Sequence, residues 1–141
     1  MGSERFWRIV FLAAAAHNIL GGLAVLFLGD WAYARAGLPP PASDVNYVRW
    51  GLLILVFGCI YVMVYRDLLN SRNLVVVGIL GKLASATPDV YYLLFRTGVP
   101  RIFWITVFTN YAFIVLFLLF LRFLGRYRLR VVVSSRDNAG A

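Results

Sequence analysis

Four apolar stretches, each long enough to cross a bilayer as a helix, constrain this chain more than any other feature. About 20 helical residues cross a hydrocarbon core of about 30 Å, and each stretch has about that length. The longest connection between them, residues 29–46, is a loop with three consecutive prolines. The sequence therefore predicts an all-α membrane protein, a single bundle of four transmembrane helices. The predicted spans are residues 6–28, 47–65, 74–95 and 102–121.

The composition and its patterning exclude the main rival classes. Hydrophobic residues make up 62% of the chain and charged residues 14%, well below the ~25% charged residues of a typical soluble domain. A transmembrane β-barrel needs segments of about ten residues that alternate in hydrophobicity, and the run IVLFLLFL does not alternate. The first stretch is too long for the apolar part of a signal peptide and is interrupted by His17 and Asn18, so we expect an uncleaved first helix.

The arginines are distributed unevenly and predict the orientation of the bundle. Nine adjoin the termini or the second connection: Arg5, Arg8, Arg66, Arg72, Arg122, Arg126, Arg128, Arg130 and Arg136. Four lie near the opposite ends of the spans: Arg35, Arg49, Arg96 and Arg101. Because cytoplasmic loops carry the excess of positive charge, we expect cytoplasmic termini and a location in the inner (cytoplasmic) membrane. Aromatic residues predict an interfacial belt on the other side: Trp31, Tyr33, Tyr47 and Trp50.

The basic tail, residues 122–141, is open to two interpretations. Clustered arginines occur in nucleic-acid-binding proteins, but these begin where the fourth apolar stretch ends, so contact with anionic headgroups already explains them. We therefore expect no nucleic-acid partner. The three valines at 131–133 indicate a short strand or an interfacial segment, and the last polar residues are typical of disorder.

A polar stripe interrupts the third apolar stretch. Its members are four, three, four and three residues apart, which places them on one face of a helix: Gly78, Lys82, Ser85, Asp89 and Tyr92. Pro88 lies beside the stripe, lacks a backbone N–H and predicts a bend in the helix. Ionisable residues inside a membrane cost about 2.5–3.5 kcal/mol each on insertion and are candidate functional residues. We expect this face to line the interior of the bundle, with a polar pocket at the bend.

The helical rise of about 1.5 Å per residue predicts one polar layer near the middle of the membrane. The depth places His17, Asn18, Lys82 and Asn110 in this layer. With Ser85 of the pocket at the bend, they make up the predicted polar interior, or ligand-binding set. Asp89 lies nearer the non-cytoplasmic end of its helix, where Arg49 is the expected counter-charge. These two residues predict an outer charge pair or gate.

Several roles remain open for these residues. Lys82 either binds a ligand or is held structurally by the amide oxygens of Asn18 and Asn110, and a proton-responsive role with His17 is a further alternative. One histidine and one cysteine, Cys59, do not make a metal or haem site within one chain, so we expect neither metal nor cofactor. The sequence lacks paired carboxylates, nucleophile–base sets and phosphate-binding glycine loops. An enzyme that uses Lys82 or His17 in acid–base catalysis is therefore the least favoured alternative.

The number of spans, the chain length and the expected cytoplasmic termini resemble those of DoxX-like and related small bacterial four-helix membrane proteins. The resemblance implies a bundle of this kind and assigns no role to any residue. From the residues, we expect an integral membrane protein that binds, or helps to transport, a small anionic or amphipathic ligand in a polar cavity. Transport would require a homodimer. The alternative is a non-catalytic accessory or assembly subunit, in which the polar stripe contacts another protein of a larger membrane complex.

Overall fold

Helices account for almost all of the described chain. The computed structural model describes residues 3–35, 37, 44–96 and 103–139, and within these ranges it contains no strand. Each helix contains a segment long and apolar enough to cross a membrane, so the predicted four-helix membrane fold is confirmed. The helices are α1, Glu4–Arg35; α2, Asp44–Arg66; α3, Arg72–Phe95; and α4, Phe103–Ala139.

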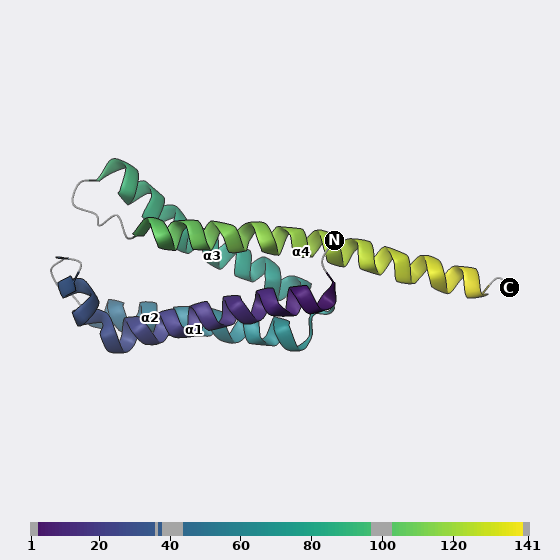
Figure 1. Cartoon of the computed structure of the whole chain (residues 1–141), viewed down its shortest axis with the longest axis horizontal. Coiled ribbons are helices and arrows are strands. Elements are labelled where there is room, and N and C mark those ends of the chain that lie inside the picture. Colours follow the sequence, from purple (N-terminus) through teal and green to yellow (C-terminus); the bar gives the residue numbers. More distant parts are fainter. Residues whose placement is uncertain (1–2, 36, 38–43, 97–102, 140–141) are drawn as a thin grey trace.

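The predicted spans fall within these helices, apart from residue 102, which lies outside the described residues. α4 is longer than expected, because residues 122–139 continue it as a helix beyond the other three (Figure 1). The alternative of a short strand at residues 131–133 was therefore wrong, and residues 134–139 are helical where disorder was expected, while residues 140 and 141 lie outside the described residues. A fall in hydropathy marks the end of the apolar span but does not end a helix. Proline is the residue that most strongly ends a helix, and residues 122–139 contain no proline.

The helices form two hairpins. α1 packs along α2 and α3 packs along α4, with less contact between the two pairs. Glycines bring α1 and α2 close together: a Cβ atom on Gly22 would lie 2.9 Å from the carbonyl oxygen of Gly51. A Cβ atom on Gly58 would lie 2.7 Å from the side chain of Ile19. Small residues of this kind let membrane helices approach closely, so the first hairpin is held by contact between its two backbones.

An aromatic cluster fills the core at one end of the bundle, near Glu4, which we call the terminal end. Phe11 is fully buried, and its ring centroid lies 4.9 Å from those of Phe117 and Phe120. The ring of Tyr61 lies 5.2 Å from that of Phe117. Aromatic pairs at such distances contribute about 0.5–1.5 kcal/mol beyond their buried area. This cluster joins α1, α2 and α4.

The two hairpins diverge toward the opposite end, near Arg35 and Phe95, which we call the loop end. Figure 1 shows α3 running obliquely away from α2, so that the last turns of α3 lie apart from the start of α2. Pro88 lies inside α3 and lacks the N–H that would bond to the carbonyl oxygen of Ala84. The bundle therefore has a packed terminal end and an open loop end.

Candidate functional site

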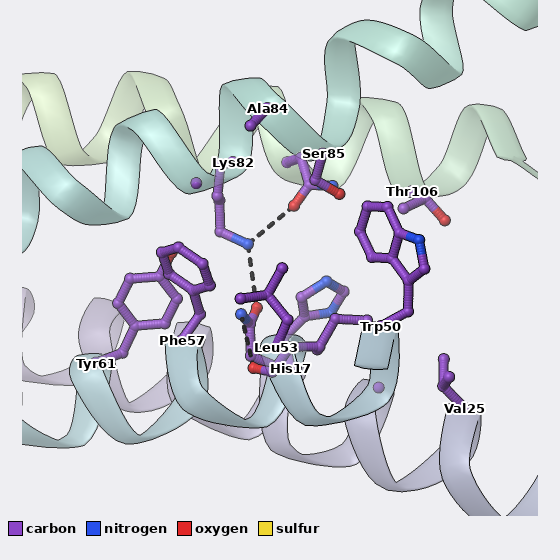
Figure 2. Close-up of a pocket in the computed structure, with 15 residues that line it drawn as sticks. His17, Val25, Trp50, Leu53, Phe57, Tyr61, Lys82, Ala84, Ser85 and Thr106 are labelled. Carbon is purple, nitrogen blue, oxygen red and sulfur yellow. Dashed lines mark hydrogen bonds between the residues drawn. The ribbon is translucent and has the colours of Figure 1, made fainter. Parts of the chain in front are cut away.

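Lys82 lies between the two hairpins (Figure 2). It is only 4% exposed. Its Nζ atom donates hydrogen bonds to Oδ1 of Asn18 at 3.1 Å and to Oδ1 of Asn110 at 2.9 Å. Asn18 belongs to α1 and Asn110 to α4, so three helices meet at one ammonium group. The structure thus brings together three members of the predicted polar layer.

The surroundings of Lys82 are amides and aromatic rings. Nδ2 of Asn18 donates to the carbonyl oxygen of Ile54 at 3.5 Å, which turns the amide oxygen of Asn18 toward the ammonium group. Nζ of Lys82 lies 5.1 Å from the ring centroid of Phe113 and 5.6 Å from that of Tyr61. Both distances are within the ~6 Å range of a cation–π interaction.

Among the described residues, no carboxylate pairs with Lys82. The ion pair observed in this part of the chain joins Arg8 to Glu4. Amide oxygens accept hydrogen bonds from an ammonium group but carry no charge that would neutralise it. A buried charge without a counter-charge is costly. The site therefore differs from a buried structural salt bridge.

Tyr61 forms the wall of the site on the side of the terminal end. Its side chain is fully buried, and its hydroxyl donates to the carbonyl oxygen of Gly78 at 3.3 Å. A Cβ atom on Gly78 would lie 2.7 Å from the tyrosine ring, so this member of the polar stripe makes room for Tyr61. Tyr61 was not among the predicted site residues. Its position seven residues after Ile54, on the same face of α2, was the available signal.

A cavity of about 540 Å³ extends from Lys82 toward the loop end, between the hairpins. Small-molecule sites usually have volumes of about 300–1,000 Å³. Figure 2 shows Phe57 and Tyr61 on one side of Lys82 and Trp50 and Val25 on the other. The four members of the predicted polar layer line the cavity, and so does Ser85. The described residues that line it are His17, Asn18, Gly21, Val25, Trp50, Leu53, Ile54, Phe57, Tyr61, Gly81, Lys82, Ala84, Ser85, Thr106 and Asn110.

His17 and Ser85 line the cavity outside the hydrogen-bonded cluster. His17 is exposed, and its ring centroid lies 5.7 Å from that of Phe113. Ser85 is half-buried and precedes Pro88 by about one turn of α3. Both side chains can exchange hydrogen bonds with a molecule in the cavity.

A metal-binding cluster is not found in the described part of the chain, where no three His, Cys, Asp or Glu side chains come together. Cys59 is exposed and does not line the cavity. The chemistry that the site offers is therefore that of an ammonium group, two amides, an imidazole and the hydroxyls of Ser85, Thr106 and Tyr61.

Arg49 and Asp89 do not form the predicted charge pair. Both belong to the described chain, and no ion pair joins them. Arg49 is exposed, Asp89 is half-buried, and neither lines the cavity. The predicted pairing was wrong because Arg49 lies on α2 and Asp89 on the part of α3 that diverges from it (Figure 1).

Two aromatic residues contribute to the site in ways that the sequence did not predict. Phe113 presents its ring to both Lys82 and His17. It follows Asn110 by three residues, a spacing that places both on one face of α4. This spacing could have predicted that Phe113 belongs to the site. Trp50, which was expected in an aromatic belt, lines the cavity and is 50% exposed. Its position depends on the divergence of the hairpins, which no local pattern encodes.

Neither a protein-family model, nor a curated protein, nor a solved structure matches this chain. The chemistry of the site is therefore inferred from its own residues. Lys82, Asn18 and Asn110 form the polar end of the cavity, which we call its polar floor, and aromatic side chains form part of its walls.

Proposed function

We propose that this chain is a small integral membrane protein that binds, or helps to transport, a small anionic or amphipathic ligand between its hairpins. The observation that supports this most directly is the ammonium group of Lys82, buried on the cavity wall. Its partners are Asn18 and Asn110, and no carboxylate among the described residues pairs with it. An anionic ligand would supply the missing counter-charge.

The electrostatic gain from such a ligand is substantial. Two unit charges 4 Å apart attract each other by about 4 kcal/mol at an effective dielectric constant of about 20. Ligand sites are mostly apolar, with a few polar groups that fix the orientation of the ligand. This cavity has that composition, because the Lys82 cluster is its polar part and Leu53, Ile54 and Phe57 are among its apolar walls.

The orientation that we propose places the terminal end in the cytoplasm and the protein in the cytoplasmic membrane. Nine arginines that adjoin the termini or the second connection in the sequence, against four beside the first and third connections, support it. The cavity then opens toward the outer half of the bilayer. A chain of this size has little room for alternating access, so a transport function would require a homodimer.

The test is native mass spectrometry of protein extracted in a mild detergent, comparing the wild type with Lys82→Met. Methionine keeps much of the length of the lysine side chain and removes its charge. Arg49→Met is the matched control, because it removes a positive charge from α2 outside the cavity lining. Thermal unfolding of each variant verifies that the fold is retained.

We expect one small molecule to accompany the wild type and Arg49→Met and to be missing from Lys82→Met. The same molecule on Lys82→Met at undiminished occupancy would contradict the proposal. A co-purifying protein in fixed ratio, without any small molecule, would also contradict it and would favour an accessory subunit of a larger complex.

A further inference from the structure

The polar floor of the cavity has hydrogen-bond donors left over. An ammonium group has three N–H donors, and among the described residues those of Lys82 meet two acceptors, the oxygens of Asn18 and Asn110. The oxygen of Asn110 already accepts a hydrogen bond from Lys82. The amide nitrogen of Asn110, Nδ2, is therefore the part of this side chain still able to bind another group. This nitrogen bonds to no atom of the described residues. Among the described residues, the buried side-chain nitrogen without a hydrogen-bond partner belongs to Trp7. The unbonded nitrogen of Asn110 is therefore not fully enclosed, and Asn110 is one of the residues that line the cavity.

These donors call for a ligand group that only accepts hydrogen bonds. Nζ of Lys82 and Nδ2 of Asn110 belong to neighbouring side chains, since the ammonium group and the Asn110 oxygen are 2.9 Å apart. A carboxylate has two oxygens and no donor, so it can accept from both nitrogens at once. Among the described residues that line the cavity, Lys82 is the one lysine or arginine, and none is an aspartate or glutamate. The ligand charge that this lining balances is therefore a single negative charge.

The rest of the cavity is shaped for an apolar chain. On the side of Lys82 that faces the loop end, Figure 2 shows Leu53, Trp50 and Val25 in succession. These side chains offer apolar and aromatic surface. A cavity of about 540 Å³ is within the range of sites for drug-sized molecules, which suits one alkyl chain better than a phospholipid with two.

We propose that the ligand is a single-chain amphiphile with a carboxylate head, a long-chain alkyl carboxylate. The carboxylate lies on Nζ of Lys82 and Nδ2 of Asn110, and the chain follows Leu53, Trp50 and Val25 toward the loop end. The ligand reaches the site from the bilayer, through the opening between the diverging hairpins. This inference rests on the proposed function and specifies the chemical class of its ligand.

The test uses the tryptophan that lines the cavity as a reporter. Purified protein in detergent is titrated with an alkyl carboxylate that carries bromine at mid-chain, because bromine quenches indole fluorescence on contact. The same titration is made with the methyl ester, which has no charge. Trp50→Phe removes the reporter, and Trp31→Phe is the matched control, because Trp31 is 62% exposed and does not line the cavity.

We expect saturable quenching of the wild type and of Trp31→Phe by the carboxylate, and loss of that saturable component in Trp50→Phe. Half-maximal quenching should require a ligand concentration about tenfold higher or more when the methyl ester replaces the carboxylate, and likewise when Lys82→Met replaces the wild type. Equal quenching by ester and carboxylate, or no saturable quenching of Trp50, would overturn the inference. If a Lys82-dependent molecule of another class still appears in native mass spectra, the proposed function stands and this inference alone fails. If no such molecule appears either, both fail.

Discussion

Lys82 on α3 donates a hydrogen bond of 3.1 Å to Asn18 on α1, and this bond joins the two helix hairpins. With the bond from Lys82 to Asn110 at 2.9 Å, it fixes an ammonium group where the hairpins begin to separate. The same group thus contributes to the packing of the bundle and to the polar floor of the cavity. The two roles can be separated by experiment.

Asn18→Leu should lower the free energy of unfolding, because it removes one of the two acceptors of a buried ammonium group. Hydrogen bonds to charged groups contribute about 1.5–3 kcal/mol, and a loss of that size is expected in unfolding by a denaturing detergent. In a Lys82→Met background the same change should cost much less, because the two residues are coupled. Asn73→Leu, at an exposed position of α3, is the control. Equal stability of Asn18→Leu and wild type would show that the bond contributes nothing.

Gly22→Ala should destabilise the first hairpin. The added Cβ would lie 2.9 Å from the carbonyl oxygen of Gly51 and 2.8 Å from the side chain of Leu55, and overpacking of this kind costs about 1–3 kcal/mol. Gly125→Ala is the matched control, since no atom lies within 4 Å of its added Cβ and alanine is the better helix former. The unfolding temperature of Gly22→Ala should be lower than that of the wild type. The unfolding temperature of Gly125→Ala should equal or exceed that of the wild type. The reverse order would refute close packing of α1 on α2.

Phe117→Ala should cost about 3–5 kcal/mol, because it opens a cavity in the aromatic cluster of the terminal end. Phe117 is fully buried, whereas Phe108 on the same helix is 68% exposed. Phe108→Ala should therefore change the free energy of unfolding by about 0.5 kcal/mol or less. Two variants of equal stability would mean that the core does not lie where Phe11, Phe117 and Phe120 meet.

The orientation of the bundle can be measured with cysteines introduced into a Cys59→Ser background. Ser3→Cys lies at the terminal end and Asn46→Cys at the loop end, and both positions are exposed. A reagent that cannot cross the membrane should label Asn46→Cys in intact cells and Ser3→Cys only after permeabilisation. The opposite pattern would show that the arginine asymmetry has been misinterpreted.

The four helices could be predicted from the sequence because the thickness of a bilayer fixes the length of an apolar span. The proximity of Lys82, Asn18 and Asn110 also followed from local rules, since a constant rise per residue sets the depth of each side chain. Both predictions depend on distances along single helices. They need no knowledge of how the helices cross.

The features that the sequence did not reveal depend on the angle between the hairpins. Divergence at the loop end separates Arg49 from Asp89 and leaves Trp50 on a cavity wall. Pro88 indicates a bend in α3, but no local pattern gives the angle between the hairpins. The length of α4 was missed for a different reason: the apolar run ends at residue 121, whereas the helix continues to Ala139.

The most direct test of the central claim, that the buried charge of Lys82 serves an anionic ligand, is the occupancy of that ligand in Asn110→Asp. The new carboxylate would replace an amide oxygen 2.9 Å from the ammonium group and would act as a built-in counter-charge. We predict that native mass spectra of Asn110→Asp show a folded protein without the molecule that accompanies the wild type, while Asn73→Asp retains it. Retention of that molecule by Asn110→Asp at wild-type occupancy would contradict the account.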